Sequence, residues 1–260
     1  MPPPPAEHSS VNSVEKPPNT LSASMKAIAR ILLPACLVVA LFPHCSGKFN
    51  FLDRAVTEGV IEYALSFPDH DPNSLMAGML PERTTLTFNG ERQVAELSSG
   101  MGLFRTTMVT NDLEQVMDYH MSLLSKKIVA HMKPSDLRLF NPDASAVTIV
   151  HTSDIDTIAG YPCKRALAIF DAVDQHEVEL WYTDRIEMKN PNWFSPFPEI
   201  DGVLLRYEMV QYGMRMRLEA LSVTPGEVDP AKFEVKPDFQ SVPASVLHNE
   251  LAEVLGTFTM

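Results

Sequence analysis

The stretch VLLRYEMVQYGMRMRLEALS, residues 203–222, decides the fold class of this chain. Apolar and polar side chains alternate on both sides of Tyr212-Gly213, which is the period of half-buried β-strands. A two-residue loop at Tyr212-Gly213 sets the register, because a slip of one residue would move every apolar side chain to the wrong face. The stretch therefore predicts a hairpin with one apolar and one charged face. Its cross-strand pairs are Met209–Met216, Tyr207–Leu218, Leu205–Ala220, Glu208–Arg217 and Arg206–Glu219.

Similar alternation recurs at intervals of about ten residues, the spacing expected of an antiparallel meander or open barrel. Ten or eleven strands are too many for one flat sheet, so the sheet must curl or split. The sequence therefore predicts a mainly β (α+β) fold, a curled antiparallel half-barrel of about ten strands with a few short helices. The further strands are expected at 59–67, 84–88, 92–97, 103–110, 114–121, 123–132, 146–155, 163–171 and 177–183.

Asn89-Gly90 joins two of these strands and is a dipeptide typical of hairpin turns. A two-residue loop and a three-residue loop with a bulge both fit the pattern. The longer loop pairs Leu86 with Val94, and the shorter loop does not.

Helical patterns are short and few. Helices are expected at 75–80, 137–140 and 243–255, the last being the longest. Apolar side chains form one stripe along 243–255, so this helix should pack against the sheet. The stripe consists of Val246, Leu247, Leu251, Val254 and Leu255.

The beginning of the chain has the pattern of a targeting segment rather than that of a folded element. Residues 1–24 contain six Pro and five Ser but few large aliphatic residues, so they predict a disordered extension. Lys26 and Arg30 then precede an apolar run at 31–42, which is too short to span a membrane. Residues 25–45 therefore predict an export signal, and Met25 is the start that such a signal would normally have.

Cys45 is a candidate for lipidation, which would make the product an envelope lipoprotein. Ordinary cleavage near Ser46 is the alternative. Removing the signal leaves Cys163 without an intramolecular partner if Cys45 is acylated, so Cys163 is expected to be a small buried packing residue. We expect a single β-rich domain over 50–260, located in the periplasm or anchored to the outer membrane.

Composition excludes several classes of protein. Of the 260 residues, 45% are hydrophobic and 21% charged, which excludes a collagen, a polytopic membrane protein and a wholly disordered chain. The 21 basic and 33 acidic residues give a net charge of -12. Because no basic field attracts phosphate backbones, nucleic acid is not expected as a partner.

Three segments carry a resemblance to known families. They are Thr157–Ala166 (TIAGYPCKRA), Trp181–Ile186 (WYTDRI) and Gly202–Leu205 (GVLL). Together they resemble the central signature of exported bacterial envelope proteins in the GLPGLI group, which are similar to the LolA-like lipoprotein-carrier fold. The resemblance implies a curled half-barrel with helices in its mouth and an envelope location. It transfers no catalytic residue.

The first functional hypothesis is a non-catalytic envelope protein that holds a lipid or another apolar small molecule in the half-barrel. Such a ligand needs a cavity of roughly 300 to 1,000 Å³ lined by apolar side chains. The candidate lining is Tyr63, Leu65, Leu205, Tyr207, Met209, Met216 and Leu218.

The second hypothesis is an adaptor with a filled core that binds an envelope protein partner. The prolines of 190–198 prevent that segment from continuing a β-ladder, so Trp193, Phe194 and Phe197 lie in a loop. Aromatic side chains on a loop offer a surface to a partner. The alternative is a loop that folds back and plugs an open end of the barrel.

No other pattern indicates chemistry. The sequence has no nucleophile elbow, phosphate loop or HExxH motif, and its histidines lack metal-ligand spacing. Met209, Met214 and Met216 cluster at one hairpin, but flexible core filling explains them better than copper binding. Asp154 and Asp156 are interpreted as solvated rather than as a cation site. We therefore expect no enzyme activity, cofactor or metal.

Overall fold

Strands β10 (Val203–Gln211) and β11 (Met214–Pro225) form the hairpin predicted from 203–222. Four of the five predicted cross-strand pairs are present, including Met209 opposite Met216; the pairing ends at Arg206–Glu219, one position short of Leu205–Ala220. Tyr212 and Gly213 have φ of 52° and 76°, the left-handed region that a primed two-residue turn requires. On the outer face, Arg217 Nε donates to Glu208 Oε1 at 2.6 Å. The alternating pattern was therefore sufficient to predict both faces and the register.

The computed structural model describes residues 55–71, 73–74, 77–140, 147–171 and 177–257. The expected extension at 1–24, the export signal at 25–45 and Cys45 lie outside these residues. All the described residues belong to one compact unit, Asn50–Met260. Its remaining strands are β1 (Gly59–Ser66), β2 (Arg83–Phe88), β3 (Arg92–Ser99), β4 (Phe104–Asn111), β5 (Val116–Leu123), β6 (Lys126–Met132), β7 (Val147–Ile158), β8 (Tyr161–Phe170), β9 (Val178–Thr183) and β12 (Gln240–Ser241).

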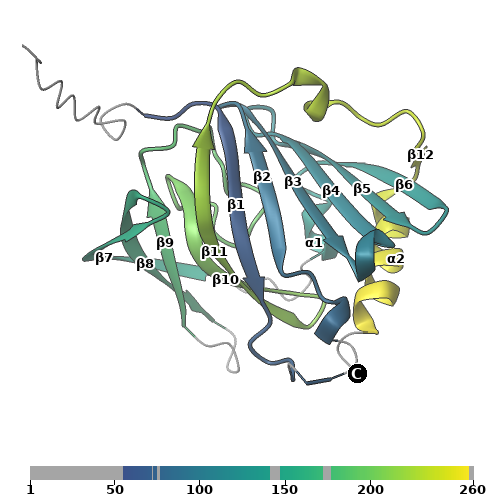
Figure 1. Cartoon of the computed structure of the whole chain (residues 1–260), viewed down its shortest axis with the longest axis horizontal. Helices are drawn as coiled ribbons and strands as arrows, with labels where there is room; N and C mark the ends of the chain where they lie inside the picture. Colours follow the sequence, from purple (N-terminus) through teal and green to yellow (C-terminus); the bar gives the residue numbers. More distant parts are fainter. Residues whose placement is uncertain (1–54, 72, 75–76, 141–146, 172–176, 258–260) are drawn as a thin grey trace, which may run out of the picture. The chain divides into compact units, whose positions relative to one another are not determined.

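The twelve strands form one open sheet in the order β12-β6-β5-β4-β3-β2-β1-β11-β10-β9-β8-β7. Two meanders therefore meet at β1, one running from β2 to β6 and the other returning from β7 to β11 (Figure 1). Neighbouring strands are antiparallel, except that the two-residue β12 runs parallel to β6. The predicted mainly β class is confirmed.

The sheet curls strongly. Strands β6 and β10 are far apart in the strand order, yet side chains from both line the same cavity. Tyr63 on β1, Leu205 on β10 and Leu218 on β11 are all buried in the core on this inner side. An inner surface covered by the opposite wall explains why so many apolar side chains in this open sheet are shielded from water.

Two helices partly fill the inner side next to β4–β6. They are α1 (Leu137–Phe140) and α2 (Ala244–Gly256), and a predicted helix exists at each of these places. Leu247 and Leu251 of α2 are fully buried in a cluster with Met117, Tyr119 and other side chains of β4–β6. Val246, which the predicted stripe included, is 40% exposed because the stripe that contacts the sheet is narrower than the sequence suggested.

Two local predictions were wrong. In the β2–β3 hairpin, Leu86 pairs with Ala95, a register that neither predicted loop produces. Asn89 N–H donates to Arg92 O at 3.0 Å, and Asn89 Oδ1 accepts from Arg92 N–H at 3.1 Å, so Asn89 closes the ladder and Gly90-Glu91 forms the loop. Of the helix expected at 75–80, the described residues contain only a 3₁₀ turn, η3 (Ala77–Met79).

Cys163 is fully buried and forms no disulfide, as predicted for a packing residue. Burial raises the pKa of its thiol to about 11, so the thiolate form is disfavoured. The Cys163 thiol is therefore a poor nucleophile at neutral pH.

The segment after β11 crosses the outer face of β3–β6 before it forms β12. Its 3₁₀ turn η5 (Pro230–Phe233) places Phe233 in a small buried cluster with Val94 and Val109. Further along, the Phe239 ring meets the His120 ring edge to face, with 5.0 Å between centroids. Neighbouring residues on a strand point to opposite faces, so this segment covers the face opposite the cavity.

The buried contact between His120 and Phe239 makes the free energy of unfolding depend on pH. Burial of His120 lowers the pKa of its imidazole from 6.5, with Lys236 adding to the effect and a hydrogen bond to Thr107 and the charge of Asp118 opposing it. The unfolded chain therefore binds a proton at a higher pH than the folded chain does. The stabilisation is complete above pH 6.5 and is lost as the pH falls below it.

We expect the free energy of unfolding of the wild type to decrease more between about pH 7.5 and pH 5.5 than that of a His120→Leu variant. Urea unfolding at the two pH values measures both decreases. Other groups titrate in both proteins, so the difference between them isolates His120. Equal decreases would show that His120 does not couple folding to protonation.

Candidate functional site

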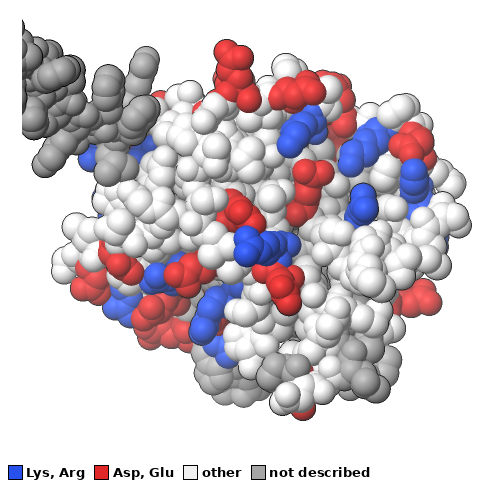
Figure 2. Space-filling model, in the orientation of Figure 1, with Lys and Arg blue, Asp and Glu red and all other residues white. Residues whose placement is uncertain are grey.

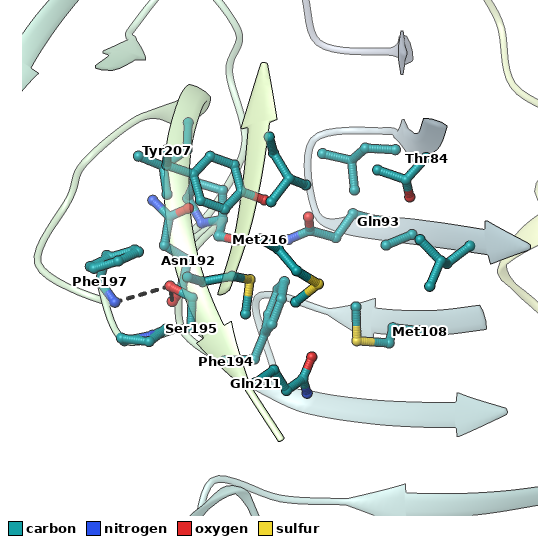
Figure 3. Close-up of a pocket in the computed structure, with 18 of the residues that line it drawn as sticks. Thr84, Gln93, Met108, Asn192, Phe194, Ser195, Phe197, Tyr207, Gln211 and Met216 are labelled. Carbon is teal, nitrogen blue, oxygen red and sulfur yellow. Dashed lines mark hydrogen bonds between the residues drawn. The ribbon is translucent and has the colours of Figure 1, made fainter. Parts of the chain in front are cut away.

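The curled sheet encloses a cavity of about 210 Å³ on its inner side. Figure 3 shows the side chains of this cavity, which come from both walls of the sheet. A second, smaller space of about 40 Å³ continues it and shares Leu97, Thr106, Tyr119, Gln211 and Met216 with it. The larger space falls below the volume of roughly 300 to 1,000 Å³ expected from sequence. It suits a slender ligand better than a bulky one.

The structure brings together most of the residues predicted to line such a cavity. Tyr63, Leu65, Tyr207, Met209, Met216 and Leu218 all line it. Leu205 does not; its side chain is fully buried within the core. A bulge between β10 and β9 interrupts the regular pairing between Leu204 and Arg206, and this local irregularity was not readable from the alternation.

Sequence analysis missed the part of the lining that comes from the other wall. These residues lie on β2–β6, on α1 and in the loop between β9 and β10. The additional lining includes Thr84, Leu86, Gln93, Ala95, Leu97, Thr106, Met108, Met117, Tyr119, Met132, Phe140 and Asn192. One signal was available: Gln93 lies on the same strand face as Ala95 and Leu97, and a polar side chain on an apolar face marks either a satisfied buried group or a site.

The cavity lining carries no charge. None of the described residues that line either space is Lys, Arg, His, Asp or Glu. By contrast, basic and acidic side chains lie next to one another on the outer surface (Figure 2). Arg206, for example, donates to Asp156 at 3.0 Å and to Glu219 at 2.9 Å. A charged ligand group would find no counter-ion inside, and burying a charge unpaired is costly.

The aromatic loop of 190–198 folds into the molecule. Trp193 is 8% exposed and Phe197 is fully buried, while Phe194 is partly buried and lines the cavity. This placement is the plug that sequence analysis gave as the alternative to a partner-binding loop. Trp193 and Phe197 therefore have almost no surface to offer to a partner.

A buried carboxylate holds this loop in place. Asp112, directly after β4, accepts hydrogen bonds from Trp193 Nε1 at 3.0 Å, Gln93 Nε2 at 2.8 Å and Thr110 Oγ1 at 2.6 Å. Burial raises the pKa of Asp112 from 3.8 to about 6, although these three hydrogen bonds act in the opposite direction. The network joins β3, β4 and the loop, so it determines the position of one side of the cavity.

The described residues of the cavity form no arrangement suited to acid–base or metal chemistry. Its phenols are not activated: burial raises the pKa of Tyr119 and of Tyr207 to about 12, and that of Tyr63 well above its usual value. Among the described residues, no three His, Cys, Asp or Glu side chains are grouped to hold a metal ion. The arrangement can bind by exclusion of water and by hydrogen bonding.

Comparisons with known proteins add little to this description. No family model and no curated protein matches the chain. A solved structure described as a beta-barrel-like protein of a domain of unknown function, DUF1849, from Brucella abortus is similar over 67% of this chain and 99% of that chain. Its identity is 10% and its TM-score is 0.31. The GLPGLI and LolA-like resemblance thus remains a prediction, whereas the mainly β sheet is an observation.

Proposed function

We propose that this chain is a non-catalytic binding protein of the cell envelope that holds a slender apolar molecule, such as a single lipid chain, under its curled sheet. The supporting observation is the uncharged cavity of about 210 Å³ between the two walls. Removal of apolar surface from water would drive binding, at roughly 25 cal/mol for each Å² buried.

The chemistry of the walls supports reversible holding rather than reaction. Met108, Met209 and Met216 contribute thioether side chains to the lining. Methionine is unbranched and flexible, so it adapts to ligands of different shape.

The proposal that the protein is exported rests on the pattern of residues 25–45. Among the described residues, no helix is both long and apolar enough to cross a membrane.

Native mass spectrometry of the protein purified gently from its own cells tests both parts of the proposal. We expect a population heavier than the polypeptide by the mass of an apolar ligand, and a polypeptide that lacks residues 1–44 or 1–45. The ligand-free protein should also take up N-phenyl-1-naphthylamine, an uncharged fluorescent probe. A protein that carries no ligand and takes up no probe would contradict the binding proposal.

A further inference from the structure

Two amide side chains of the cavity lining have an oxygen atom that accepts no hydrogen bond from the described residues. Gln93 lies on β3 and is 3% exposed, and Asn192 lies in the loop between β9 and β10 and is 7% exposed. Buried amides normally satisfy both their N–H groups and their oxygen. Here the N–H groups are satisfied by protein atoms, whereas neither oxygen accepts a hydrogen bond from the described residues.

Gln93 is locked in one orientation. Its Nε2 donates to Asp112 Oδ2 at 2.8 Å and to Pro191 O at 2.9 Å, which uses both N–H groups. Rotating the amide by 180° would place Oε1 against two acceptor oxygens, so the orientation is determined by the network. No donor to Oε1 is found in the part of the chain that the structure describes. This oxygen is an acceptor without a partner in the wall of the cavity.

Asn192 repeats the arrangement one residue after Pro191. Its Nδ2 donates to Ile200 O and to Gly202 O, each at 2.8 Å, so its orientation is also determined. Within the described ranges, Oδ1 likewise receives no hydrogen bond. Because Gln93 bonds to the carbonyl of Pro191, the two amides are held in one region of the cavity wall (Figure 3).

A third polar group of the lining can bond in either direction. Tyr207 lies on β10, and its ring meets the ring of Tyr63 edge to face, with 6.4 Å between centroids. The Tyr63 hydroxyl donates to Leu204 O at 2.8 Å, but no described group bonds to the Tyr207 hydroxyl. A phenol can donate to an oxygen of the ligand while the amides accept.

We propose that the ligand is an uncharged amphiphile whose polar end donates O–H or N–H hydrogen bonds to Gln93 Oε1, to Asn192 Oδ1 or, where it has two donors, to both. Long-chain alcohols and primary acyl amides belong to this class. A fatty-acid anion does not, because its carboxylate would face two acceptor oxygens with no cation among the described lining residues. This inference rests on the proposed function and specifies which apolar ligands the cavity prefers.

Four ligands with the same twelve-carbon chain test the inference on the unmodified protein. They are dodecanol, dodecyl methyl ether, dodecanamide and, at pH 8, dodecanoate, each used to displace N-phenyl-1-naphthylamine. Methylation replaces the O–H donor by a methyl group and keeps the oxygen as an acceptor, so we expect the ether to bind about tenfold more weakly than the alcohol. Dodecanamide should bind at least as well as the alcohol, and dodecanoate should be the weakest.

Each outcome has a distinct meaning. Equal displacement by the alcohol and the ether, or preferential binding of dodecanoate, would overturn the donor inference and leave the apolar cavity standing. Displacement by none of the four would overturn the proposed function as well.

A pair of glutamine variants locates the acceptor. Gln93→Met should abolish the roughly tenfold preference for the alcohol over the ether. Gln240→Met is the matched control, since Gln240 lies exposed on β12 and outside the cavity lining. That variant should keep the preference. If Gln93→Met fails to fold, the ligand series on the wild type still decides the question.

Discussion

Met216→Trp is expected to weaken binding of N-phenyl-1-naphthylamine by at least about tenfold, which corresponds to about 1.4 kcal/mol. Met216 lines both the main cavity and its smaller extension, and it lies opposite Met209 across the β10–β11 hairpin. An indole at this position occupies much of a space of about 210 Å³. Fluorescence titration of the probe measures the dissociation constant directly.

Leu221→Trp is the matched control on the same strand. Leu221 is 46% exposed and lies outside the cavity lining, so the added indole should leave the dissociation constant unchanged. A larger side chain in a packed site lowers the free energy of unfolding by about 1 to 3 kcal/mol. Circular dichroism and urea unfolding are therefore used to test whether both variants are folded. A folded Met216→Trp variant with wild-type affinity would place the ligand elsewhere.

Asp112→Ala is expected to lower the free energy of unfolding by about 3 kcal/mol or more at about pH 4, where the wild-type carboxyl is protonated. The substitution removes the acceptor for Trp193, Gln93 and Thr110 together. Each buried donor left without a partner costs about 1 to 3 kcal/mol. Release of the loop would expose Trp193 to water, so urea unfolding and a red shift of tryptophan emission report the loss.

The same carboxyl couples stability to pH in a way that Asp112→Asn removes. The pKa of Asp112 is raised from 3.8 to about 6, so between these values the folded chain binds more protons than the unfolded chain. The contribution of this group to the free energy of unfolding therefore decreases by about 3 kcal/mol as the pH rises through that window. Above the window its contribution is constant. Asp112→Asn should show none of this decrease.

An exposed carboxyl provides the control for that experiment. Asp154 is bonded to Arg165, which lowers the pKa of Asp154, so its contribution is present at neutral pH and is lost on acidification. Asp154→Asn should leave the decrease between about pH 4 and pH 6 intact. If Asp112→Asn also retains that decrease, the buried carboxyl is not its source.

Local sequence pattern predicted the elements that form between neighbours in the chain. The β10–β11 hairpin and its charge pairs followed from alternation and a two-residue turn, because both strands of a hairpin are encoded in one short stretch. The same reasoning found one wall of the cavity, through Tyr63, Tyr207 and Met216. It failed at Asn89, where a side-chain hydrogen bond moved the loop by one position, and at Leu205, where a bulge on β10 changed the environment.

By itself, the sequence determined that this is a mainly β chain whose strands each present an apolar face, and it indicated which residues of the central hairpin share that face. Only the tertiary structure decided what lies opposite them. The second wall comes from β2–β6 and from the loop that Asp112 anchors. Strands β2–β6 are more than sixty residues from the hairpin, and the loop is held to the end of β4 by the buried hydrogen bond from Trp193 to Asp112. Alternation along a strand shows which of its side chains share a face, because it depends on neighbours in the chain. The curl of the sheet and the filling of its inner side by α2 depend on contacts between distant segments. The same holds for the oxygens of Gln93 and Asn192, which accept no hydrogen bond from the described residues.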